Sequence, residues 1–170
     1  MFFNYQDFYA QVAARADFKT FVELGVYAGD SLAFLHSELE KRGTPYTLCG
    51  IDLWEEGYAR TGYHRHLPQG LRQMVEKRFE DAKSVFLVQD ESAAAASRFT
   101  DQSVDFVFID ANHSEEFVTR DIAAWLPKVR PGGMISGHDF REPCGVEAAV
   151  VKAFGEGNFS VIGTVWHKTV

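Results

Sequence analysis

The sequence has few cysteines and no long hydrophobic run. Its two cysteines, Cys49 and Cys144, lie far apart and outside any CxxC pattern, which excludes a disulfide framework and a zinc knuckle. We therefore expect both thiols to be reduced. The apolar runs are far shorter than the roughly 20 residues of a membrane-spanning helix, so we expect no membrane partner.

The sequence also has no excess of basic residues. Its 17 Lys and Arg stand against 24 Asp and Glu, which gives a net charge of −7. A protein with this balance lacks the basic surface of a nucleic-acid-binding domain, so we expect no nucleic-acid partner. The beginning of the chain, MFFNYQDF, has neither a basic region nor a long apolar region. We therefore expect a cytoplasmic protein.

What is present is the composition of an ordinary globular protein. Hydrophobic residues make up 46% of the 170 residues, enough for one domain with a core of its own. We expect residues 1–170 to form a single domain, with a short helix within residues 1–18 ahead of the first strand.

Short apolar runs alternate with segments of helical periodicity, which is typical of an α/β fold with a mainly parallel sheet. The pattern predicts strands at 20–24, 46–51, 85–88, 104–109 and 134–137, and a C-terminal hairpin centred near Gly163. It predicts helices at 4–15, 31–42, 69–81, from about 92, at 115–126 and at 145–154. Ser31 is a candidate N-cap, and Met74 is expected in the buried face of helix 69–81.

An acidic residue lies at or just after the end of every predicted parallel strand. These residues are Glu23, Asp52, Asp90, Asp110 and Asp139. Asp is common in such turns because it caps helices, which is the alternative for any one of them. Because the carboxyl ends of parallel strands line one crevice, the group as a whole predicts a pocket that favours positive charge.

The turn after the first strand reads ELGVYAGDS at 23–31. It fails the dinucleotide pattern GxGxxG, because Tyr27 and Asp30 occupy two of the glycine positions, and it lacks the GK[ST] of a phosphate-binding loop. Gly25 and Gly29 still allow a ligand to approach the backbone. With Asp52 placed to accept hydrogen bonds from a ribose diol, the pattern predicts a nucleoside-type ligand.

Longer motifs resemble the class I S-adenosylmethionine-dependent methyltransferases, in particular the small bacterial and phage-type branch with a strand-four motif like IDxxHSYE. The matching segments are FVELGVYAGDS at 21–31, GIDLW at 50–54, QDES at 89–92, the stretch from Phe108 to Phe140, and TVWHK at 164–168. The resemblance implies a Rossmann-like doubly wound seven-stranded sheet in the order 3-2-1-4-5-7-6. Strand 7 would be antiparallel, with helices on both faces.

The resemblance also implies roles for single residues. Glu23, Gly25 and Gly29 would form the loop at the methionine end of S-adenosyl-L-methionine, and Tyr27, Ser31 and Asp110 are further candidate cofactor-binding residues. Asp52 would accept hydrogen bonds from the ribose, and the adenine would be bound by Leu53, Trp54, Asp90, Glu91 and Ser92. The chain departs from the family pattern at Glu115-Glu116, where Tyr-Glu is usual, so the role of that aromatic side chain is either missing or supplied by Phe117.

The function implied is methyl transfer to a small-molecule acceptor, with an oxygen atom as the expected acceptor atom. His113, His138 and Asp139 are the candidate catalytic residues. Asp110 and Asp139 are candidate ligands for Mg²⁺ or Mn²⁺, with Asn112 or His113 as a third. The alternatives are structural histidines, a metal-free base at His138, a hydroxylase-like metal enzyme on the same scaffold, and a non-catalytic module that binds the cofactor.

The segment from 53 to 68 is a candidate lid over the acceptor, and its alternative is a solvated loop. Its polar and aromatic side chains are Tyr58, Arg60, Tyr63, His64, Arg65 and His66. We expect this loop, the first helix or a partner subunit to recognise the acceptor. Phe2, Phe3 and Tyr5 would cover the pocket or join two protomers in a homodimer.

Overall fold

The computed structural model describes residues 5–54 and 68–170. The strands are β1 (Thr20–Leu24), β2 (Thr47–Asp52), β3 (Val85–Gln89), β4 (Val104–Ile109), β5 (Val129–Gly137), β6 (Ser160–Ile162) and β7 (Val165–Thr169). The α-helices are α1 (Tyr5–Ala13), α2 (Asp30–Arg42), α3 (Leu71–Arg78), α4 (Ser92–Ala95), α5 (Glu115–Trp125) and α6 (Val146–Phe154), and the 3₁₀ turns are η1 (Ala96–Arg98) and η2 (Leu126–Lys128).

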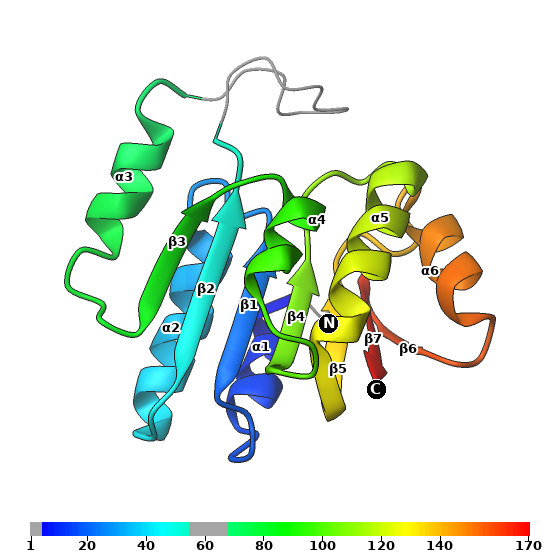
Figure 1. The fold of residues 1–170 in the computed structure, drawn as a ribbon, viewed down its shortest axis with the longest axis horizontal. Coiled ribbons are helices and arrows are strands. Elements are labelled where there is room, and N and C mark those ends of the chain that lie inside the picture. The colour runs from blue at the N-terminus through cyan, green and yellow to red at the C-terminus, as the bar shows by residue number, and fades with distance from the viewer. Residues whose placement is uncertain (1–4, 55–67) are drawn as a thin grey trace.

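The strands form one seven-stranded sheet in the order β3-β2-β1-β4-β5-β7-β6 (Figure 1). The pairs from β3 to β5 are parallel, whereas β7 pairs antiparallel with both β5 and β6. This is the predicted order with the predicted antiparallel strand. The order reverses direction between β1 and β4, which places the carboxyl ends of these two neighbouring strands on either side of a crevice.

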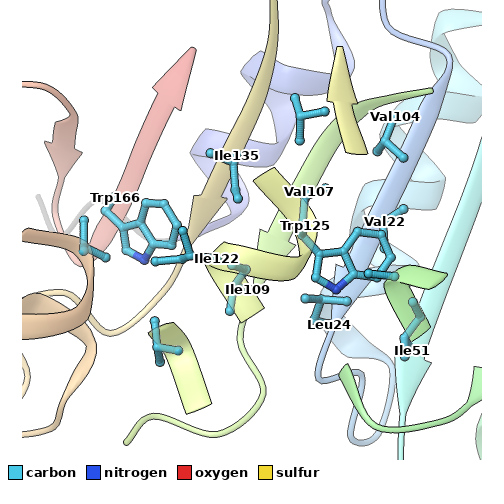
Figure 2. Packing of buried hydrophobic residues seen from close by; sticks show 14 of the residues in the cluster. Val22, Leu24, Ile51, Val104, Val107, Ile109, Ile122, Trp125, Ile135 and Trp166 are labelled. Atoms are coloured by element: carbon cyan, nitrogen blue, oxygen red, sulfur yellow. The ribbon is translucent and has the colours of Figure 1, made fainter. Parts of the chain in front are cut away.

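Two hydrophobic clusters cover the two faces of the sheet. Helices α1, α2 and α3 pack on one face, and α4, α5 and α6 pack on the other (Figure 1). Because β4 is covered on both faces, all six of its residues are buried, as its nearly continuous apolar sequence predicts. In the second cluster Trp125 of α5 and Trp166 of β7 lie among the aliphatic side chains of the central strands (Figure 2).

The structure corrects three local predictions. Strand β5 begins at Val129 rather than at 134, because the chain continues in the sheet through Pro131-Gly132-Gly133 with a register irregularity opposite β4. Ser31 is not the N-cap of α2, which begins after Gly29, and its hydroxyl donates instead to Glu23. Met74 is 63% exposed, because it lies on the outer face of α3.

Cys49 and Cys144 are both free thiols. Among the described helices, none is long and apolar enough to pass through a membrane. The side chains expected to form a lid, Tyr58 to His66, and the pair Phe2-Phe3 lie outside the described residues.

Candidate functional site

A cavity of about 290 Å³ opens at the carboxyl ends of β1, β2, β3 and β4. Its described lining consists of Tyr5, Gly25, Val26, Tyr27, Ala28, Asp30, Ser31, Ile51, Asp52, Leu53, Asp90, Glu91, Ser92, Asp110, Ala111, Asn112 and Phe117. Four different strand ends thus contribute to one hollow. This is the edge at which the sequence places the acidic residues.

The backbone at Gly25 is in direct contact with the end of β4. Gly25 has φ +91°, and a Cβ atom at this position would lie 2.1 Å from the carbonyl oxygen of Asp110. Its N–H donates to the carbonyl of Ile51 at 2.8 Å. Only glycine fits here, because any side chain would overlap the backbone of Asp110 and would strain the turn. The turn is therefore packed tightly between β2 and β4.

Glu23 lies beneath this turn and is 1% exposed. The hydroxyl of Tyr9 donates to its Oε2 at 2.8 Å, and the hydroxyl of Ser31 donates to its Oε1 at 2.6 Å. Burial raises the pKa of Glu23 to about 8, and the negative charges of Asp110 and Asp52 act in the same direction. Glu23 is thus a support under the cavity, held by α1 and α2, rather than part of the described lining.

Asp52 organises the turns after β1 and β2. Its Oδ2 accepts a hydrogen bond from the N–H of Tyr27 at 2.9 Å, and its Oδ1 accepts one from the N–H of Trp54 at 2.9 Å. The indole N–H of Trp54 donates to the carbonyl of Tyr27 at 3.0 Å. Trp54 is 8% exposed and is not part of the described lining, whereas its neighbour Leu53 is. The apolar wall therefore comes from Leu53, Ile51 and Phe117.

Asp90, Glu91 and Ser92 line the cavity beyond β3. Asp90 forms an ion pair with Arg98 at 2.7 Å, and the hydrogen bond from this guanidinium holds the pKa of Asp90 below its usual value. Glu91 caps α4 by accepting from the N–H of Ala94 at 2.8 Å. The hydroxyl of Ser92 donates to Oδ1 of Asp121 in α5 at 2.5 Å.

A second group of side chains lies around Asp110, where the ends of β4 and β5 meet. His113 contacts Asp110 through Nε2 at 3.3 Å and Asp139 through Nδ1 at 3.0 Å. His138 contacts Asp139 through Nδ1 at 2.9 Å, and its Nε2 contacts the hydroxyl of Thr164 at 3.0 Å. Ligand-type atoms of Asp110, His113 and Asp139 all lie within 4.8 Å of one another.

Charge coupling shifts the pKa values within this group. The carboxylate of Asp110, 3.3 Å from Nε2 of His113, raises the pKa of His113. Burial lowers the pKa of His138, but the hydrogen bond with Asp139 and the negative charges of Asp110, Asp139 and Glu142 together outweigh burial, so this pKa is also raised. Burial raises the pKa of Asp110. At Asp139 burial acts in the same direction, but the hydrogen bond from His138 and the charges of His113 and His138 together outweigh it, and the pKa is lowered.

The structure brings most of the predicted site residues together. The predicted cofactor-binding residues that line the cavity are Gly25, Tyr27, Ser31, Asp52, Leu53, Asp90, Glu91, Ser92 and Asp110. Glu23, Gly29 and Trp54 are not among its described lining residues. The candidate catalytic residues His113, His138 and Asp139 lie next to the cavity and are joined to it through Asp110.

Sequence reasoning missed three contributors. Asp121 is buried behind Ser92, and Thr164 reaches His138 from the turn between β6 and β7. Arg120 is stacked over the ring of Phe117, 5.2 Å from its centre. Helical periodicity from Ile122 and Val118 places Asp121 close to the buried face of α5, which was the available signal. No comparable signal marks Thr164.

A family model described as a methyltransferase domain matches residues 22–140 of this chain. A comparison with curated protein sequences finds no match.

Solved structures share the fold at low sequence identity. The O-methyltransferase NovP is 15% identical, with a TM-score of 0.75 over 98% of this chain and 80% of that chain. A methyltransferase from Podospora anserina, PaMTH1, bound to S-adenosylhomocysteine (SAH), is 12% identical, with a TM-score of 0.69 over 96% of this chain and 76% of that one. MycE, a mycinamycin-pathway methyltransferase in complex with Mg, SAH and mycinamycin VI, is 17% identical, with a TM-score of 0.60 over 97% of this chain and 48% of that one.

The matched segment runs from β1 through the end of β5 and so includes every strand end that lines the cavity. On this match over more than half of its length, the chain belongs to the methyltransferase-domain family.

Proposed function

We propose that this protein is an S-adenosyl-L-methionine-dependent O-methyltransferase that acts on a small-molecule acceptor and uses a divalent cation. The observation that carries the proposal is the position of Asp110. This residue lines the cavity and also belongs to the group with His113 and Asp139. A cofactor in the cavity and a cation in that group would therefore be neighbours.

The residues of the cavity fit the cofactor. The turn at Gly25 has no room for a side chain, and Ser31 and Asp52 border the same hollow. The carboxylates of this edge favour a ligand with positive charges, such as a sulfonium and an ammonium group. Asp52 lines the cavity at the end of β2, and a carboxylate at this strand end suits the hydroxyl groups of a ribose diol. The bound cofactor would supply the methyl group on its sulfonium.

The donor set of Asp110, His113 and Asp139 fits a Mg²⁺- or Mn²⁺-type ion, since two carboxylates and an imidazole lie within 4.8 Å of one another. Such an ion would bind the acceptor oxygen and lower its pKa. The carboxylates of Asp110 and Asp139 lie close enough to repel each other. The two histidines reduce this repulsion, and a cation bound between the carboxylates would reduce it further.

His138 is the candidate base of this proposal. Its Nδ1 donates to the carboxylate of Asp139, which leaves Nε2 as the acceptor for the hydroxyl of Thr164. To take a proton from an acceptor hydroxyl, Nε2 would exchange the Thr164 hydroxyl for the acceptor's. Asp139 would keep the ring oriented during this exchange and would stabilise the imidazolium that forms.

Calorimetric titration with SAH, with and without Mg²⁺, tests the proposal. We expect the unaltered chain to bind SAH. We expect Asp52→Asn to weaken SAH binding by about 5- to 100-fold, because a charged acceptor is lost. We expect Asp139→Asn to keep most of the SAH affinity and to lose Mg²⁺ binding. Asp81→Asn is the matched control, because Asp81 is an exposed carboxylate outside the cavity and the metal-type group.

Each component of the proposal has its own contradicting result. Equal SAH affinity in the unaltered chain and in Asp52→Asn would contradict the cofactor assignment. Mg²⁺ binding that survives in Asp139→Asn would contradict the cation assignment alone. Mg²⁺ binding without any SAH binding would favour a different metal enzyme on this scaffold, and SAH binding without transfer to any oxygen acceptor would favour a non-catalytic module.

A further inference from the structure

Helix α5 holds the cavity wall beyond β3 at three points. The hydroxyl of Ser92 donates to Oδ1 of Asp121 at 2.5 Å, and the carbonyl of Ser92 accepts from the indole N–H of Trp125 at 2.8 Å. Arg120 approaches the carboxylate of Glu91 to 3.2 Å. Ser92 is thus fixed through both its side chain and its backbone by residues on one helix.

Asp121 is an unexpected residue at this place. Its side chain is fully buried, at 0% exposure, among the apolar residues Val118, Ile122 and Trp125 of the same helix. Its Oδ2 has no hydrogen-bond partner in the part of the chain that the structure describes. Burial raises its pKa to about 7. A buried carboxyl group with a single partner costs folding free energy, and an apolar side chain would pack here at least as well. Folding stability therefore does not account for Asp121.

The contact with Asp121 fixes the polarity of the Ser92 hydroxyl. A hydroxyl group has one proton to donate and two lone pairs. Because the Ser92 proton is engaged by Asp121, only the lone pairs remain for a ligand in the cavity. This holds whether Asp121 is ionised or carries a proton on Oδ2, since Oδ1 accepts in both states. The neighbouring side chains on this wall, Asp90 and Glu91, are carboxylates. The side chains after β3 thus present acceptors to the cavity.

Building on the proposed function, we infer that Asp121 is a positioning residue that sets the purine specificity of the site. It holds Ser92 as an acceptor, so that the wall after β3 selects a purine with an amino group and rejects one with a carbonyl at the same position. The amino group of adenine would donate to this wall. The carbonyl of hypoxanthine would place a lone pair against the lone pairs of Ser92, leaving both without a partner.

The test compares binding of SAH with binding of S-inosylhomocysteine, which differs from SAH by a carbonyl in place of the amino group. Isothermal titration should give the unaltered chain a preference for SAH of about 10- to 100-fold. Asp121→Leu frees the Ser92 hydroxyl to rotate and donate, so its preference should fall below about 5-fold. Most of this change should come from tighter binding of S-inosylhomocysteine.

Two further variants separate a positioning effect from a loss of structure. Ser92→Ala removes the hydroxyl itself and should lower the preference on its own. In that background Asp121→Leu should have no additional effect on the preference, because its effect passes through Ser92. Thr119→Val is the matched control. The hydroxyl of Thr119 on the same helix is also buried without a hydrogen-bond partner among the described residues, and its removal should leave the preference unchanged.

An unchanged preference in a folded Asp121→Leu variant would overturn the inference. The proposed cofactor would still be supported in that case, provided that the unaltered chain binds SAH. If Asp121→Leu does not fold, Ser92→Ala alone decides, and an unchanged preference there would overturn the inference. Failure of the unaltered chain to bind SAH would overturn the proposed function together with this inference.

Discussion

Gly25 and Gly43 both have a positive φ, +91° and +68°, in different surroundings. At Gly25 a Cβ atom would lie 2.1 Å from the carbonyl oxygen of Asp110, whereas at Gly43 no atom would lie within 4 Å. Gly43 ends α2 at the surface, but Gly25 separates two strand ends inside the site. The two residues thus allow backbone strain to be separated from steric overlap.

We expect Gly43→Ala to lower the free energy of unfolding by about 1 kcal/mol, which is the usual cost of a left-handed Ala. Gly25→Ala should lower it by at least about 3 kcal/mol, since the overlap with Asp110 adds to the same strain. Urea denaturation followed by circular dichroism measures both values. Equal losses in the two variants would show that the close approach to Asp110 is not a constraint.

Helix α3 was predicted correctly as a helix, but the set of its residues that are buried was not. The apolar pattern indicated the helix, and Leu71 and Val75 are buried as expected. The neighbouring Met74 belongs to the same pattern but is exposed, because α3 lies beside the edge strand β3 (Figure 1) and buries only Leu71 and Val75. Which apolar residues of a short helix are buried depends on where the sheet ends, and periodicity does not carry that information.

We expect Val75→Ala to lower the free energy of unfolding by about 1.5–3 kcal/mol, because it removes two methyl groups from a buried position. Met74→Ala, on the same helix, should change it by less than about 0.5 kcal/mol. The midpoints of urea unfolding report both effects. A loss at Met74 as large as that at Val75 would mean that a partner covers the outer face of α3 in solution.

At the scale of the whole molecule, Asp121 makes stability depend on pH. Its folded-state pKa of about 7 lies above the ordinary value near 3.8, so the folded chain binds this proton more tightly than the unfolded chain does. Burial is the main cause; the charge of Glu91 adds to it, and Arg120 acts against it. The contribution of this carboxyl to the free energy of unfolding is therefore complete below about pH 4 and is lost as the pH rises to about 7.

Asp121→Asn removes this titration and keeps an acceptor for Ser92. We compare the free energy of unfolding of the variant with that of the unaltered chain at each pH. The difference should shift in favour of the variant by roughly 2–4 kcal/mol as the pH rises from about 4 to about 8. Urea denaturation at a series of pH values measures the difference. Glu23, whose pKa is raised to about 8, titrates in both proteins, so its effect cancels. A difference that stays constant with pH would refute the raised pKa of Asp121.

The fold of the whole molecule could be predicted from the sequence because the order of strands and helices along the chain indicates it. Alternating apolar runs and helical segments, with the resemblance, predicted the sheet order and the gathering of Asp52, Asp90 and Asp110 at one edge. The contacts of Asp121 with Ser92 and of Thr164 with His138 were not predictable, because each joins side chains far apart in the sequence whose relative position is set only by tertiary packing.

The central pair of strands, β1 and β4, also has a consequence for how the protein forms. Phe21 of β1 pairs with Phe106 of β4, so a loop that contains β2, β3 and their helices must close before the two strand ends meet. Closing so long a loop lowers the entropy of the chain before the contacts between the two strands can stabilise the pair, and this slows folding. During synthesis, β1 to β3 emerge from the ribosome before β4 exists, and the turn at Gly25 then has no Asp110 to pack against. We therefore expect the cavity to form late in folding, and an N-terminal fragment that stops short of β4 would lack it.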